Sequence, residues 1–224
     1  MLVSAHSLIL LPMTLRKTAD SRRREIADAA LKVIAEQGLA RFTSKAIARE
    51  VGVSDAALFR HFATKEDIVL AVIDRVEEIL FADFPPAGSD PIERLGLFFR
   101  RRIAVIRESP GVASLVGSEQ LSQAAPPEGV VRVAEFRQRS RLFVRSCLVE
   151  AHRDGLLAEG VGPEEAVVLV LGALLALAHA PPGLRPRTAL PERVWGVLER
   201  VLRRPVRRAT TRARLRAVPT RSRS

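Results

Sequence analysis

Histidine and cysteine, which most often supply nucleophiles, general bases and transition-metal ligands, are sparse and scattered in this sequence. Its 224 residues include four histidines and one cysteine, Cys147. No pair of histidines has a metal-ligand spacing such as His-x3-His, and no glycine-rich phosphate loop or third partner near Cys147 completes a catalytic set. A single cysteine excludes an intramolecular disulfide and is typical of the reducing cytoplasm. The sequence therefore predicts a cytoplasmic protein without enzymatic activity, bound metal or cofactor.

A different chemistry is indicated between Thr43 and Lys65, where hydroxyl and basic side chains are interleaved with small and apolar ones. The stretch has the pattern of two short helices joined by Gly52-Val53-Ser54. The glycine permits a left-handed turn, and Ser54 can cap the second helix. In such a helix-turn-helix the second helix enters the major groove of DNA and the first contacts phosphates. The segment therefore predicts binding to double-stranded DNA.

The net charge of +11 is concentrated at the two ends of the chain. Residues 1–24 carry +4 and residues 203–224 carry +9, whereas residues 25–202 carry −2. Basic arms on a nearly neutral body are typical of proteins that approach a polyanion. Tails that only increase solubility are the alternative. The cluster Arg22-Arg23-Arg24 has the same two interpretations, a contact with DNA phosphate or minor groove, or a solvated arm.

Breaker residues divide the chain into helical segments, and no long stretch alternates with a period of two. The fold class predicted is therefore all-α, with about nine helices. The apolar run from Ala166 to Ala180 is shorter than the roughly 20 residues of a membrane span, and Leu8–Leu11 lacks the basic region that precedes an export signal. The helices expected are Ser21–Gln37, short ones from Thr43 and Ser54, Thr64 to before Pro85, Pro91–Glu108, Pro110–Ser122, Glu128–Arg153, Pro163–His179 and Pro191–Arg203.

These segments suggest an N-terminal three-helix DNA-binding head and a C-terminal helical bundle for dimerisation and ligand binding. The boundaries expected are a flexible basic arm over 1–20, a head over 21–66, a regulatory and dimerisation domain over 67–203, and a disordered Arg-rich tail over 204–224. The helix-turn-helix occupies about 45–64, and a fourth helix extends the head to about 81. Met13 is an alternative start to Met1.

The head resembles the TetR family of bacterial regulators over about residues 22–81. The matching residues are Ile26, Ala29-Ala30, Gly38, Thr43, Ile47-Ala48, Gly52-Val53-Ser54, Leu58-Phe59, His61-Phe62 and Lys65. An ordered set of this density is much more specific than a bare helix-turn-helix pattern. The resemblance implies a homodimer that binds a palindromic operator.

By that resemblance, two groups of residues and Lys65 contact DNA. The start of the supporting helix, where free backbone N–H groups favour an anion, meets phosphate, and the recognition helix faces the groove. The residues are Thr43, Ser44 and Lys45 in the first group, Ser54, Asp55, Ala56, Ala57, Phe59, Arg60 and His61 in the second, and Lys65 on a phosphate. The family usually has tyrosine where Phe59 stands, so one hydroxyl contact is missing here. Asp55 either accepts from a cytosine amine or is a solvated charge at a helix start.

Two further sets of residues are candidates for a sensory pocket and for a dimer interface. Apolar side chains around one arginine suggest a pocket for an apolar or amphipathic effector, with a simple helical core as the alternative. The pocket candidates are Phe98, Phe99, Arg102, Ile106, Phe136, Phe143 and Cys147. The last two helices are more apolar than one buried face requires, which suggests a second subunit. The interface candidates are Val167, Leu171, Leu174, Leu175, Trp195 and Leu198.

The function predicted is a sequence-specific transcriptional regulator, a repressor released by a small-molecule effector. The alternative is a nucleoid-associated or division-regulating DNA-binding protein that uses the same head and has a protein partner. Binding confined to one promoter favours the first, and many dispersed sites favour the second.

Overall fold

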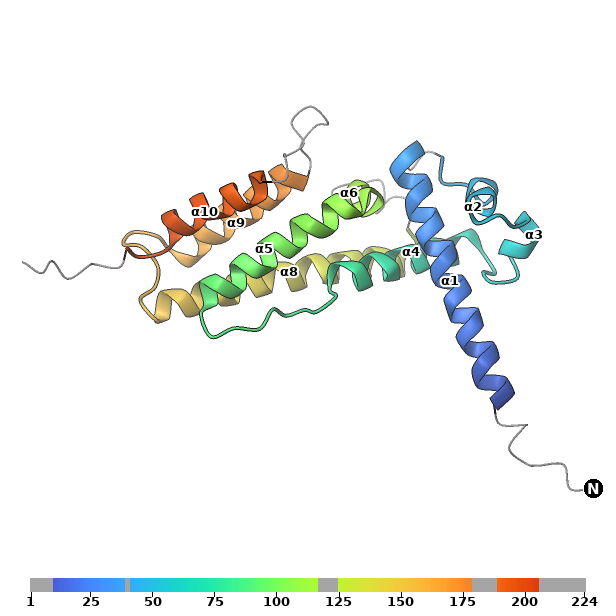
Figure 1. Cartoon of the computed structure of the whole chain (residues 1–224), viewed down its shortest axis with the longest axis horizontal. Coiled ribbons are helices and arrows are strands. Elements are labelled where there is room, and N and C mark those ends of the chain that lie inside the picture. Colours follow the sequence, from blue (N-terminus) through green and yellow to red (C-terminus); the bar gives the residue numbers. More distant parts are fainter. Residues whose placement is uncertain (1–9, 39–40, 117–124, 179–188, 206–224) are drawn as a thin grey trace, which may run out of the picture.

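A computed structural model shows the chain as an elongated assembly of helices (Figure 1). It describes residues 10–38, 41–116, 125–178 and 189–205. Within these ranges there are nine helices, and the only β feature is one isolated bridge between Leu157 and Arg203. The all-α prediction is thereby confirmed. The helices are α1 Leu10–Gln37, α2 Ser44–Val51, α3 Asp55–Leu58, α4 Lys65–Leu80, α5 Pro91–Glu108, α6 Pro110–Val116, α8 Pro127–Arg153, α9 Pro163–Ala178 and α10 Leu190–Leu202.

Local capping contacts fix the short helices of the head. The Oγ1 atom of Thr43 accepts from the backbone N–H of Ala46 at 3.2 Å, and Gly52 ends α2 with φ of 78° in the left-handed region. The Ser54 hydroxyl then accepts from the Ala57 N–H at 3.1 Å and begins α3. Each cap satisfies a backbone group that a helix end leaves unpaired. The turn between α2 and α3 is therefore set by the residues that the sequence places there.

One continuous core joins the head to the neighbouring helices. Apolar residues of α1, α2, α3 and α4 are buried together, and residues of α6 and α8 belong to the same cluster. Val112 and Leu115 of α6 and Phe136 of α8 are all less than 4% exposed in this cluster. The head is thus packed onto the body, and its core includes α4, to which the sequence analysis extended the head, together with residues of α6 and α8.

A second core lies between α5, α8, α9 and α10, which run side by side at the other end of the molecule (Figure 1). Phe99 of α5 packs on Trp195 of α10 with ring centroids 5.4 Å apart. Gly96 makes this approach possible, because a Cβ atom there would lie 2.7 Å from the indole. The two cores therefore share α5 and α8 as the long elements that connect them.

The largest difference from the sequence prediction is the start of the first helix. It begins at Leu10 instead of Ser21, so half of the segment predicted as a flexible arm over 1–20 is helical. No glycine interrupts residues 10–20, and Pro12 falls in the first turn, where its missing N–H is not needed. The expected Arg-rich tail over 204–224 lies outside the described residues except for Arg204 and Pro205. Among the helices described, none has the length and apolar character to cross a membrane.

Candidate nucleic-acid interface

The residues predicted to contact DNA lie at the surface of the head. Thr43, Lys45, Ser54, Asp55, Ala56, Phe59, Arg60 and Lys65 are exposed, and Ser44, Ala57 and His61 are partly exposed. Leu58 and Phe62, on the opposite side of the same segment, are at most 1% exposed. Residues 54–62, here called the recognition segment, therefore have one apolar side that is buried in the core and one side that is exposed to solvent.

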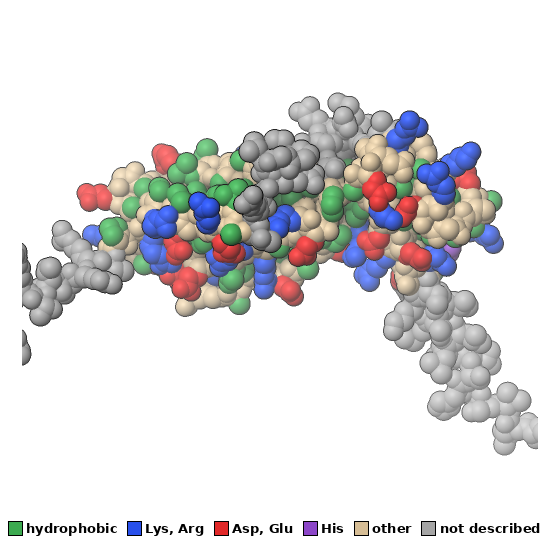
Figure 2. All heavy atoms as spheres, turned by 45° about the horizontal axis from the view of Figure 1, so that its top comes forward, with side chains coloured by type: hydrophobic (Ala, Val, Ile, Leu, Met, Phe, Trp, Pro, Cys, Tyr) green, Lys and Arg blue, Asp and Glu red, His purple; other side chains and the backbone are tan. Residues whose placement is uncertain are grey.

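A groove separates the middle of α1 from α3 and the turns on either side of α3. Its volume is about 400 Å³, and it is lined by Arg22, Ile26, Val53, Ala57, Arg60 and His61. Lysine and arginine side chains gather around this end of the molecule (Figure 2). A groove edged by arginines is suited to a phosphate backbone, because cation contacts with phosphate provide most of the sequence-independent affinity for DNA.

Phe59 is 39% exposed, which is unusual for a phenylalanine beside a core. Phe59 precedes Arg60 in the sequence, and its ring has no hydroxyl group that could donate a hydrogen bond to a phosphate. It can contribute apolar contact with a thymine methyl group or a sugar.

The arginines at 22–24 are engaged within the chain. Arg22 pairs with Glu25 at 2.7 Å, and Arg24 pairs with Glu78 at 3.2 Å. Arg23 donates to the carbonyl oxygen of His61 at 2.8 Å, and its guanidinium carbon lies 4.3 Å from the centroid of the Phe62 ring. Sequence reasoning missed the role of Arg23, since 38 residues separate it from its partner. It ties α1 to the end of the recognition segment.

We expect Arg23→Met to lower the free energy of unfolding by about 1 kcal/mol, because a hydrogen bond and a cation–π contact are lost together. Arg24→Met is the matched control, since it removes only an exposed ion pair worth about 0.5 kcal/mol or less. Urea unfolding followed by circular dichroism measures both. Equal losses in the two variants would show that the Arg23 contact does not hold the segment.

The residues predicted to form a sensory pocket are divided between the two cores. Phe98 and Phe143 lie in one aromatic cluster with centroids 5.1 Å apart, and Arg102 stacks on Phe98. Phe136 belongs to the head core, whereas Phe99 and Cys147 belong to the core between α5 and α10. Ile106 is 8% exposed. The structure therefore places Phe98, Phe99, Phe143 and Cys147 in one core, with Arg102 stacked on Phe98, and places Phe136 in the head core.

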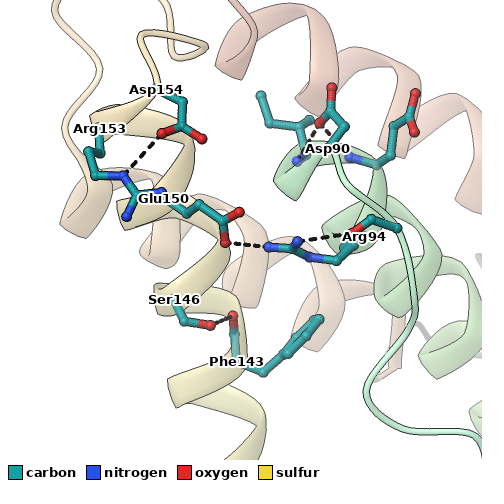
Figure 3. Close-up of polar contacts among 10 residues, drawn as sticks. Asp90, Arg94, Phe143, Ser146, Glu150, Arg153 and Asp154 are labelled. Carbon is teal, nitrogen blue, oxygen red and sulfur yellow. Dashed lines mark hydrogen bonds and ion pairs between the residues drawn. The ribbon is translucent and has the colours of Figure 1, made fainter.

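The only cysteine in the sequence, Cys147, is buried in the core. Cys147 is 2% exposed, and burial raises the pKa of its thiol, with Arg94 opposing that effect. Arg94 donates to Gly88 and forms an ion pair with Glu150, which connects α5 to α8 beside Phe143 and Ser146 (Figure 3). A buried thiol with a raised pKa is a poor nucleophile. Among the described residues, no cluster of three or more histidine, cysteine or carboxylate side chains is arranged to hold a metal.

The residues predicted for the dimer interface differ in how much surface they expose. Val167, Leu174 and Trp195 are at most 8% exposed and pack inside their own chain, so they offer little surface to a second subunit. Leu171 and Leu198 are partly buried against the same core, and only Leu175 is well exposed. The exposed apolar residues of α9 and α10 are Val168, Leu169, Leu175, Val197 and Val201. The apolar surface that α9 and α10 offer to a partner is therefore formed largely by other residues than those predicted.

Comparison with known proteins gives similarity in the head and over most of the chain. Residues 26–72 match the family model described as bacterial regulatory proteins, tetR family. A nucleoid occlusion factor SlmA of Marinomonas sp. is 28% identical over 187 residues, which is 80% of this chain and 93% of that protein. The transcriptional regulator TcmR of Streptomyces glaucescens is 31% identical over 147 residues. That match covers 63% of this chain and 62% of TcmR, so it spans less than two thirds of that relative.

Solved structures agree with the fold. The regulator AibR, crystallised with isovaleryl coenzyme A and operator DNA, superposes with a TM-score of 0.67 at 19% identity. The match covers 83% of this chain and 100% of AibR. At this identity the likeness concerns the fold, which extends through the C-terminal helices as well as the head.

Proposed function

We propose that this chain, whose residues 26–72 match the family model of bacterial regulatory proteins, tetR family, is a homodimeric repressor that a small-molecule effector releases from a palindromic operator in the cytoplasm. The observation that carries this proposal is the recognition segment, with Leu58 and Phe62 fixed in the core and Asp55, Ala56 and Arg60 exposed on the other side. A rigid apolar support under an exposed polar face is what reading a major groove requires.

In the proposed complex, the two groups of head residues have different tasks. Thr43, Ser44 and Lys45 at the start of α2, and Lys65 at the start of α4, hold phosphates, because both helix starts present unpaired backbone N–H groups beside a cation. Ser54, Asp55, Ala56, Ala57, Phe59, Arg60 and His61 lie on or beside the groove-facing side. Phosphate contacts set position, and only base contacts carry sequence specificity.

The C-terminal helices supply the dimer and the sensor in this proposal. A palindromic operator requires paired recognition helices about 34–36 Å apart, and the exposed apolar residues of α9 and α10 offer a surface to join two subunits. An effector can release DNA only if it binds more tightly to the form with the wrong spacing. That AibR was crystallised with both an acyl coenzyme A and operator DNA supports an effector site in the same fold.

Lys65→Ala tests the assignment of phosphate contacts. We expect it to weaken binding to all DNA sequences alike and to reduce the slope of log K against log salt by about one unit per phosphate lost. Arg60→Ala should instead change the preference among operator variants. Arg107→Ala, at an exposed site on α5, is the control. Fluorescence anisotropy over a range of salt concentrations measures all three. A changed sequence preference in Lys65→Ala would contradict the assignment.

A second candidate function is favoured by the similarity to nucleoid occlusion factors, one of which aligns over 93% of its length. In that case the chain would bind many chromosomal sites and act on a protein partner. Genome-wide mapping of bound sites distinguishes the two. Sites limited to one or a few promoters support the repressor, and dispersed sites without promoter bias support the alternative.

A further inference from the structure

Arg102 is the one charged residue that is buried in the part of the chain described. It lies in α5 and is 9% exposed. Its Nη2 atom donates to the Ser140 hydroxyl at 3.2 Å, and that hydroxyl donates in turn to the Phe136 carbonyl at 3.1 Å. The guanidinium carbon lies 4.9 Å from the Phe81 centroid and 5.0 Å from the Phe98 centroid. Arg102 is therefore enclosed mainly by aromatic rings.

No carboxylate among the described residues lies within ion-pair distance of Arg102. This distinguishes it from the other partly buried arginines of the body, because Arg94 pairs with Glu150 and Arg203 pairs with Asp90 at 2.8 Å. Arg139, which acts on Arg102, carries a charge of the same sign. Burial, followed by repulsion from Arg139, lowers the pKa of Arg102 to about 10.

Arg139 of α8 shares the ring on which Arg102 stacks. Its guanidinium carbon lies 4.3 Å from the Phe81 centroid and 5.0 Å from the Phe84 centroid. The Arg139 side chain is 47% exposed, and its pair with Glu77 is loose at 3.5 Å. Two cations thus face the same ring, one buried and one at the surface. Stacking on aromatic rings offsets only part of the cost of burying a charge.

A buried cation without a counterion destabilises the folded protein, and an anion placed between two guanidinium groups removes that cost. The planar fork of an arginine matches a carboxylate in two parallel hydrogen bonds. The rings of Phe81, Phe84, Phe98 and Phe143 surround the position with apolar surface, with neighbouring centroids 5.0 to 6.2 Å apart. The cluster thus places two guanidinium groups beside the apolar surface of phenylalanine rings.

We propose that Arg102 and Arg139 bind the carboxylate of a small organic acid whose hydrocarbon part packs against these phenylalanine rings. This inference rests on the proposed function, since the acid is the effector of that regulator. It assigns the effector class as an apolar monocarboxylate. The proposed site lies where the end of α4 meets α5 and α8, which provide Phe81, Arg102 and Arg139 in turn.

The test compares Arg102→Met with wild type and with Arg107→Met, a control at an exposed position on the same helix. Isothermal titration calorimetry with phenylacetate and octanoate is set against the neutral probes phenylacetamide and octanol. We expect at least one acid to bind wild type and Arg107→Met at least 10-fold more tightly than Arg102→Met. The neutral probes should bind all three proteins alike.

A second readout needs no ligand. If Arg102 is an uncompensated charge, Arg102→Met should raise the Tm of the free protein by about 2–4 °C, whereas a purely structural arginine would lower it. If the Tm of Arg102→Met is lower than that of wild type, and the Tm of Arg102→Lys equals that of wild type, the inference is overturned. Failure of both acids to depend on Arg102 also overturns it, whatever the Tm.

Operator binding in the same samples separates this inference from the proposed function. Anisotropy with a mapped DNA site, with and without the acid, provides that measurement. If DNA binds normally and neither acid binds through Arg102, the anion site is wrong and the DNA-binding regulator stands. If an acid binds through Arg102 without changing DNA affinity, the site stands and effector release is contradicted.

Discussion

Replacing Val168 with arginine is expected to give a folded monomer that no longer binds a palindromic operator. Val168 is 70% exposed on α9, more than any other large apolar side chain among those described as exposed. Leu169 of the same helix and Val197 and Val201 of the neighbouring α10 are also 47–51% exposed. A row of exposed valine and leucine side chains on two adjacent helices is typical of an interface between subunits.

The size of the effect follows from the way two heads bind one operator. In a dimer the second head binds at a high effective concentration, which strengthens binding by about 10²–10⁴-fold over a single head. An arginine inside the interface would leave a buried charge without a partner, and the dimer would dissociate. Operator affinity should therefore fall by about 100-fold or more while the helical content is retained.

Sedimentation equilibrium and operator titration of Val168→Arg measure the two consequences in the same samples. Val168→Thr is the matched control, because threonine keeps the shape of valine without a charge. A dimer of undiminished stability in Val168→Arg would move the interface away from α9. If such a dimer no longer bound the operator, the loss of DNA binding would not be caused by loss of dimerisation.

The sequence predicted that the last two helices meet a partner but not which of their faces does so. Helix α9 is apolar on all sides, so periodicity cannot distinguish the face toward its own core from the face toward a neighbour. Val167 and Val168 are adjacent in the sequence, yet they are 8% and 70% exposed. For the same reason the sequence analysis assigned Trp195 to the interface, although its indole packs against Phe99 and Gly96 of its own chain.

The head was predicted in more detail because its structure depends on contacts close in the sequence. Thr43 with Ala46, Ser54 with Ala57, and Thr64 with Asp67 are each separated by three residues. Such caps can be recognised from residue types and spacing alone. The helix-turn-helix and the start of α4 could therefore be predicted from the sequence, and the structure contains both.

Contacts that join distant segments could not be predicted in this way. Arg102 meets Ser140 across 38 residues, and Arg23 meets His61 across the same separation. The sequence identified Arg102 as polar within an apolar stripe. It did not show that Arg139 and Phe81 would lie beside it, because α4 and α8 reach that position only after the helices pack.

Gly111 provides the second prediction of large effect, at the place where α6 crosses the first helix of the head. A Cβ atom at Gly111 would lie 2.2 Å from the carbonyl oxygen of Leu31 and 2.8 Å from its carbonyl carbon. Both atoms belong to the backbone of α1, so a side-chain rotation cannot relieve the clash. The neighbouring Val112 and Leu115 are fully buried in the head core, which fixes α6 from the other side.

Gly111→Ala is therefore expected to move α6 away from α1 and to lower the free energy of unfolding by about 1–3 kcal/mol, as overpacking of a core does. Operator affinity should fall as well, because α1 carries the groove residues Arg22 and Ile26 and would shift relative to the body. Dimerisation should be unchanged, since α9 and α10 do not take part in this contact.

The control is Gly196→Ala on α10, where the nearest atom to an added Cβ is the Arg200 Nη1 at 3.8 Å. Alanine is favoured over glycine inside a helix by about 1 kcal/mol, so this variant should be neutral or slightly more stable. Urea unfolding, sedimentation and operator titration of both variants complete the comparison. If Gly111→Ala unfolds at the same urea concentration as wild type, α6 does not hold the head in place, and the packing of α4 against α5 and α8 is what joins the head to the body.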